Sequence, residues 1–154
     1  MKSIAVKALL QKIDQAIQDI KSFPNSSVLE ESYFAKFLVV FICGIYEEAI
    51  ETIINEWIAK FNSSQVSQFV GDSLRYTFKN PEINNIKKLL RKFDRHWERQ
   101  IDQIPNKAKT ALDSIVGDKN SLAHGNTCNI TLNDVIQFYL DSKIIIETID
   151  AAIL

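Results

Sequence analysis

The sequence predicts an all-α protein, an up-and-down bundle of about five to six helices in a single domain over residues 1–154. Apolar residues recur at the spacing of a helix face along most of the chain. Only four glycines and three prolines occur, which disfavours an all-β sandwich with its many turns. With 46% hydrophobic and 24% charged residues, the chain has an ordinary globular composition and is long enough to bury a substantial core.

Charge and cysteine content narrow the class of protein. The formal net charge of −1 excludes a chain-wide polycation, so any basic surface for nucleic acid must be local. The two cysteines, Cys43 and Cys128, are too few for a disulfide framework and favour a reducing compartment. Charges interrupt the N-terminal apolar residues, and the most apolar run, residues 37–46, is shorter than the roughly 20 residues of a membrane-spanning helix. We therefore expect a cytoplasmic protein without a membrane partner.

Two helices are expected in the first part of the chain. The amphipathic pattern of residues 3–22 ends at Pro24 and the cluster Asn25-Ser26-Ser27. Ser27 with Glu30 forms a capping-box pattern that starts a second helix, which runs to about residue 61. Its expected inward stripe is Tyr33, Phe37, Val40, Phe41, Ile45, Ala49, Ile53 and Trp57. Gly44 in this helix costs roughly 1 kcal/mol relative to Ala, which close approach of another helix, including one from a second subunit, would explain.

The middle of the chain predicts a short helix over residues 64–77 and a longer helix over 82–102, with Asn80 as cap and Pro81 in the first turn. The buried stripe of the longer helix is Ile83, Ile86, Leu90, Phe93, Trp97 and Ile101. Its other face carries Lys88, Arg91, Lys92, Arg95 and Arg99. This basic face is either a solvated surface or a groove for RNA phosphates, whose binding would weaken with salt.

The last third predicts two helices joined by a polar loop. Asn106 would cap a helix over 107–117, and Gly117 lies where the residue after a helix end is expected. The loop continues to about residue 129, and Thr131 with Asp134 gives a second capping signal for a helix that reaches the C-terminus.

This loop holds the residues best suited to chemistry. Histidine changes charge near neutral pH, so His124 can act as a general base or acid. Lys119 would stabilise negative charge that develops on a phosphorus centre, and Asn120 would orient a phosphate oxygen or the imidazole. Gly125 would let the backbone approach a ligand closely. The alternative is a histidine that only hydrogen-bonds to the backbone at a helix junction.

Other residues extend or limit this site. One of Glu47 and Glu48, on the long helix, could face the loop and hold Lys119 or His124, although a surface position is the alternative. The sequence contains no carboxylate or histidine cluster at metal-ligand spacing, so we expect no metal and no cofactor.

The arrangement Lys119-x4-His124-Gly125, with Asn120 after the cation and Ala123 before the histidine, resembles the signature of the HEPN superfamily. HEPN domains are helical bundles of prokaryotic toxins, abortive-infection systems and RNA-processing proteins. The resemblance implies a metal-independent endoribonuclease of toxin–antitoxin or antiviral defence, which cleaves RNA by His-mediated attack of the 2′-OH. It also implies a homodimer that supplies a second His124, RNA as substrate, and a cognate antitoxin as a further partner.

One position departs from the signature. The HEPN arginine is replaced by Lys119, which keeps the charge but lacks the planar fork that matches a phosphate. The alternative function is therefore a catalytically weakened HEPN-like module that binds RNA or protein.

Overall fold

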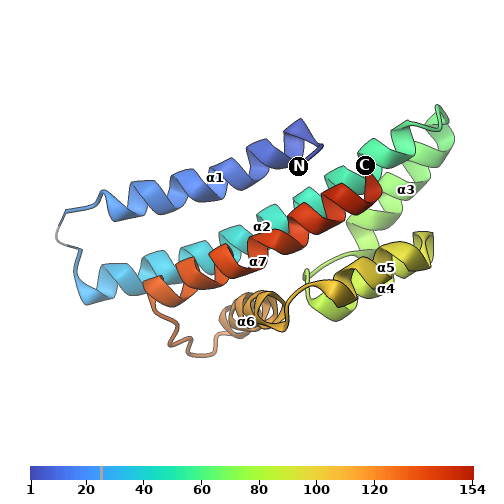
Figure 1. The fold of residues 1–154 in the computed structure, drawn as a ribbon. Coiled ribbons are helices and arrows are strands. Elements are labelled where there is room, and N and C mark those ends of the chain that lie inside the picture. The colour runs from blue at the N-terminus through green and yellow to red at the C-terminus, as the bar shows by residue number, and fades with distance from the viewer. Residues whose placement is uncertain (25) are drawn as a thin grey trace.

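The computed structural model describes residues 1–24 and 26–154, and within these residues it contains seven helices and no strand. The helices are α1 (Ile4–Lys21), α2 (Val28–Ala59), α3 (Ser64–Thr77), α4 (Ile83–Phe93), α5 (Arg95–Gln103), α6 (Asn106–Ala123) and α7 (Leu132–Ile153) (Figure 1). The all-α prediction is confirmed, but the chain forms seven helices where five to six were expected. The turn predicted at Asn25 lies outside the described residues.

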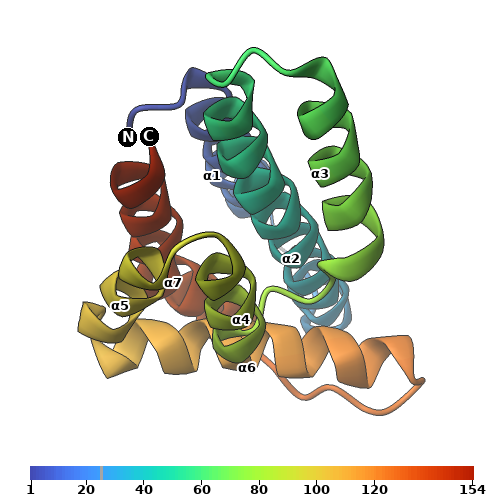
Figure 2. The ribbon, with the colours of Figure 1, turned by 90° about the vertical axis from the view of Figure 1, so that its right-hand side faces the viewer.

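The long helix α2 organises the bundle, because α1, α3, α6 and α7 all pack against it. Figure 1 shows α1, α2 and α7 running alongside one another, with α6 seen end-on below them. Figure 2 shows the same α6 crossing the lower end of this group. The bundle is therefore not purely up-and-down, since α6 lies across the long helices.

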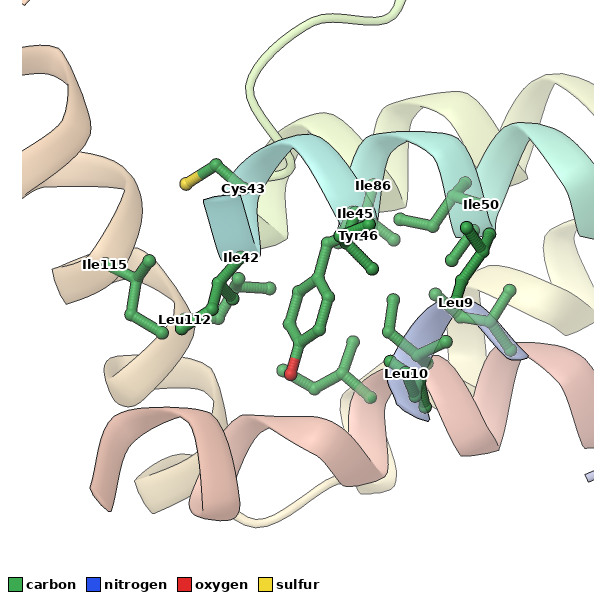
Figure 3. Close-up of a cluster of buried hydrophobic side chains, with 14 of the residues drawn as sticks. Leu9, Leu10, Ile42, Cys43, Ile45, Tyr46, Ile50, Ile86, Leu112 and Ile115 are labelled. Atoms are coloured by element: carbon green, nitrogen blue, oxygen red, sulfur yellow. The ribbon is translucent and has the colours of Figure 1, made fainter. Parts of the chain in front are cut away.

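The core is built around the buried side of α2. Figure 3 shows Tyr46 of α2 in an apolar cluster that also takes side chains from α1, including Leu10, and from α6, including Leu112. The Tyr46 hydroxyl is fully buried and lies 3.0 Å from Ser142 Oγ on α7, so its polar atom has a partner.

Local capping signals work as expected at two helix starts. Ser27 and Glu30 form a complete capping box at α2, and Thr131 and Asp134 form another at α7. The expected cap at Asn106 is wrong, because Asn106 is the first residue of α6 and Pro105 takes the cap position without a side-chain hydrogen bond.

The predicted stripe of α2 is only partly buried. Ile45, Ala49 and Ile53 lie in the core, whereas Tyr33 and Phe37 are 62% and 51% exposed. Val40 is exposed on the same side of the helix. The expectation fails because this segment is apolar around its whole circumference, so periodicity cannot tell which side a neighbouring helix will cover.

The predicted helix over 82–102 is broken. Asp94 is extended (φ −152°, ψ 128°), and its carboxylate accepts a hydrogen bond from the His96 N–H at 2.6 Å, which caps α5. The turn brings Trp97 against Trp57 of α2, with ring centroids 4.8 Å apart. The chain therefore forms two short helices in place of one long helix, and both contact the core.

Within the described residues, no helix is long and apolar enough to span a bilayer.

Candidate functional site

Helix α6 continues through the first half of the motif that was expected to be a loop. Gly117 lies inside the helix, exposed and with nothing within 4 Å of the place a Cβ would take. The helix does not end there because Leu122, one turn and more further on, packs partly buried against the core. That burial offsets the roughly 1 kcal/mol that a helical glycine costs. Lys119 and Asn120 therefore stand on a rigid helix.

The helix ends at His124, in a Schellman motif. The Gly125 N–H donates to the Leu122 carbonyl at 3.1 Å, and the Asn126 N–H donates to the Ser121 carbonyl at 2.9 Å. Gly125 has φ +71°, a conformation that favours glycine. Gly125 thus takes the role that was expected of Gly117, and it leaves the His124 side chain exposed at the end of α6.

The Lys119 ammonium is directed toward the segment between α3 and α4. Its Nζ donates a hydrogen bond to Oδ1 of Asn80, and the lysine side chain is partly buried. Because Asn80 offers a neutral oxygen, this bond orients the ammonium without cancelling its charge.

Asn80 is itself held firmly. Its backbone is left-handed (φ 59°), which asparagine tolerates better than most residues. Its N–H donates to Glu47 Oε1 at 2.9 Å, and its carbonyl accepts from Asn85 Nδ2 at 3.1 Å and from the Glu82 N–H at 2.8 Å. Glu47 therefore reaches Lys119 through Asn80, while Glu48 is exposed. The prediction that Asn80 caps α4 is wrong, because Glu82 occupies the cap position.

A second polar contact also joins the motif to the start of α4. Asn120 Nδ2 lies 3.5 Å from Glu82 Oε1, a long hydrogen bond from α6 to the start of α4. Lys119 and Asn120 are thus brought together with residues 80–82, whereas His124 has no hydrogen bond to either side chain among the described residues.

The surroundings of both cysteines favour the neutral thiol. Cys43 is buried on α2, where burial raises its pKa to about 12 even though the Lys119 charge acts in the opposite direction. Cys128 Sγ lies 3.4 Å from Asp118 Oδ1, and burial raises its pKa as well. Neither thiol forms a disulfide, and neither is activated as a nucleophile.

The predicted basic face is divided between two helices. Lys88 and Arg91 lie on α4, and Arg95 and Arg99 lie on α5, beyond the break at Asp94. All four side chains are exposed. In residues 1–24 and 26–154, no group of three or more His, Cys, Asp or Glu side chains is placed to hold a metal ion.

A family model for RiboL-PSP-HEPN domains matches residues 4–154. The chain belongs to the HEPN family. Neither the curated proteins nor the solved structures yield a match. The match covers nearly the whole chain, and the family supports a ribonuclease-like or RNA-binding module.

The sequence pattern does not predict Asn80 and Glu82 as contacts of Lys119 and Asn120. Asn80 lies 39 residues before Lys119, so no local spacing connects the two. The available signal is Asn80 before Pro81, because proline disfavours helical backbone at the preceding residue and asparagine accepts a left-handed one. That signal predicts a bend but not its partner.

Proposed function

We propose that the protein is a metal-independent endoribonuclease of toxin–antitoxin or antiviral defence, with His124 as the proton-transfer group. The observation that carries the proposal is the end of α6 in a HEPN domain: the Schellman motif holds His124 exposed, one turn and more beyond an oriented Lys119. An RNA strand can reach an exposed imidazole without any opening of the fold.

In the proposed reaction His124 accepts the proton of a ribose 2′-OH. The 2′-oxygen forms a bond to the adjacent phosphorus, and the bond from phosphorus to the 5′-oxygen breaks. The products are a 2′,3′-cyclic phosphate and a 5′-OH, whose proton comes from a second acid. An imidazole suits either role because its proton moves near neutral pH.

Lys119 would stabilise the negative charge of the phosphorane. An ammonium has three N–H donors, and the bond to Asn80 uses one of them, so two remain for phosphate oxygens. The neutral partner leaves the positive charge available, and no carboxylate within the described residues pairs with it directly.

The proposal includes a homodimer that supplies the second His124. The exposed side of α2 carries Tyr33, Phe37 and Val40, and adjacent Gly44 is open to close approach. Glu47, one turn after Gly44 on this side of α2, accepts the hydrogen bond from the Asn80 N–H, and Asn80 in turn contacts Lys119. A second copy on this apolar side would therefore lie beside the motif.

Phe37→Glu should separate the dimer, because a charge cannot be buried unpaired at an interface. Phe69→Glu is the matched control, since Phe69 is 73% exposed on α3 and is not part of the proposed contact. Light scattering should show a monomer for Phe37→Glu alone, with cleavage reduced in parallel. If the Phe37→Glu protein has the same molecular mass in solution as the parent dimer, this interface is wrong.

The cleavage test uses purified protein and RNA in the presence of a metal chelator. His124→Ala should lower the cleavage rate by about 10²- to 10⁴-fold, the usual contribution of a general acid or base. His96→Ala is the control, because His96 is the other histidine and lies exposed on α5. If His124→Ala cleaves as fast as the parent protein, the proposed chemistry is wrong.

A second candidate function is an RNA- or protein-binding module of low catalytic power, with a cognate antitoxin among its partners. It is favoured by Lys119 itself, since a single ammonium cannot make the paired contacts of a guanidinium. Lys119→Arg distinguishes the two candidates: a parent protein without cleavage that gains it in Lys119→Arg supports the binding module. A parent protein that already cleaves RNA through His124 excludes that module.

A further inference from the structure

We propose that a basic pocket between the end of α3 and one face of α4 binds the backbone phosphates of the RNA strand next to the site of cleavage. This inference rests on the proposed function, because it takes RNA as the substrate. The pocket encloses about 460 Å³ and is lined by Lys79, Lys88, Arg91 and Lys92, with Thr77 and Asn85 as neutral polar groups.

The charge of this pocket is one-sided. Its lining contains four cations and no acidic residue, although the whole chain has a net charge of −1. Arg91 has a distant ion pair with Glu98 at 3.7 Å, whereas no ion pair involves the three lysines in residues 1–24 and 26–154. Neighbouring Lys87, which is not in the lining, pairs with Asp102 at 2.6 Å. Clustered, unpaired cations repel one another, and a polyanion relieves that repulsion.

The lining is arranged on one side of α4. Asn85, Lys88 and Lys92 follow the spacing of a helix face, opposite the buried Ile86 and Leu90. Both lysines are exposed, but they stand on a helix that is anchored in the core. The packing of α4 therefore fixes the backbone positions of these cations.

The pocket and the motif share one segment of chain. Asn85 lines the pocket and donates to the carbonyl of Asn80, whose side chain accepts the hydrogen bond from Lys119. Lys79 directly precedes Asn80 and belongs to the lining. Residues 79–80 thus have a cation on the pocket side and the Lys119 contact on the motif side. A strand with one phosphate at Lys119 would place the neighbouring phosphates toward this pocket.

The lining favours phosphate over a base. Phe78 is its aromatic residue, and it is only 4% exposed, so the pocket offers no open ring on which a base could stack. Recognition by charge alone is the pattern of sequence-independent backbone binding.

The test measures binding of a short, labelled single-stranded RNA by fluorescence anisotropy, with His124→Ala in every protein so that the RNA stays intact. Lys88→Ala/Lys92→Ala should weaken binding at least tenfold at low salt. The slope of log K against log salt should also fall by about 1.4, because each lost phosphate contact on a single strand removes roughly 0.7. Lys12→Ala/Lys21→Ala is the matched control, since it removes two exposed lysines from α1.

Equal RNA affinity of the pocket variant and its parent would overturn the inference, and so would a parent protein that binds no RNA at low salt. Lys88→Gln/Lys92→Gln repeats the measurement with longer neutral side chains, and thermal melting confirms that both pairs fold. If the cleavage test fails but the pocket variant still loses RNA affinity, the inference holds, because the binding assay requires no catalysis.

A free nucleotide is the competing source of phosphate. Calorimetric titration with a nucleoside triphosphate and with inorganic phosphate separates the two ligands. If the parent binds the triphosphate tightly and the pocket variant does not, while the affinity for RNA is unchanged, then the pocket binds a small phosphate-bearing ligand and not the RNA backbone. Weak triphosphate binding together with the loss of RNA affinity supports the RNA backbone.

Discussion

His124 and Lys119 belong to one motif, but their surroundings are opposite. His124 is exposed at the end of α6, whereas the ammonium of Lys119 is partly buried and bound to Asn80. The hydrogen bond to Asn80 thus orients the lysine in the fold itself. The position of the histidine is fixed by the Schellman backbone at the end of α6.

Glu51 on α2 carries a residue-scale prediction for pH. Burial raises its pKa, the carboxylates of Glu47 and Glu48 add to the rise, and Arg75 on α3 opposes it. Because the folded pKa lies above the unfolded value, ionised Glu51 destabilises the fold at neutral pH, and this penalty disappears below the ordinary pKa of 4.5. Glu51→Gln should therefore raise the melting temperature at pH 7 and leave it unchanged near pH 4.

The control for this effect is Glu147→Gln, at an exposed position on α7. It should change the melting temperature little at either pH. A Glu51→Gln stabilisation of equal size at pH 4 and pH 7 would contradict the charge argument, since protonated glutamate and glutamine have the same charge.

At the scale of the element, the extent of α6 depends on two glycines. Gly117 is helical, and Gly125 ends the helix with φ +71°. The residue type is the same in both places, but one position costs backbone entropy and the other avoids a steric penalty.

The two glycines give a matched pair of predictions. Gly117→Ala should stabilise the protein by about 0.5–1 kcal/mol, because nothing lies within 4 Å of the added Cβ and alanine is the better helix former. Gly125→Ala should destabilise it by about 1–2 kcal/mol, the cost of a left-handed backbone for a residue with a Cβ. Urea unfolding measures both changes. Two effects of the same sign would contradict the assigned backbone roles.

At the scale of the whole molecule, the two ends of the described chain are tied together. Figures 1 and 2 both show the start of α1 beside the end of α7. The buried carboxylate of Asp150 accepts hydrogen bonds from the N–H groups of Lys2 and Ser3, the latter at 2.8 Å. Ser3 also caps α1 and donates to Glu56 of α2 at 2.7 Å. Three helices therefore meet at one polar junction.

Asp150→Ala should detach this junction. The Ser3 N–H would remain buried without an acceptor, which costs about 1–3 kcal/mol for each such group. Asp72→Ala is the control, because Asp72 is exposed on α3, and it should stay within about 0.5 kcal/mol of the parent. Urea unfolding compares the two. An Asp150→Ala protein as stable as Asp72→Ala would show that the junction adds no stability.

Much of the fold follows from local interactions in the sequence. The capping boxes at Ser27 and Thr131 start helices where the residue pattern predicts them, because their hydrogen bonds span only three residues. The motif from Lys119 to Gly125 is also visible in the sequence, and the family match confirms the HEPN membership that it indicates.

Only the tertiary structure decided which of the two glycines ends α6 and which side of α2 faces the core. It also decided the break at Asp94, where packing of Trp97 on Trp57 outweighs a continuous helix. The tertiary structure likewise decided the contact of Asn80 that orients Lys119. In each case the local sequence is compatible with more than one conformation. The choice comes from burial and hydrogen bonds to residues far along the chain, which no local pattern contains.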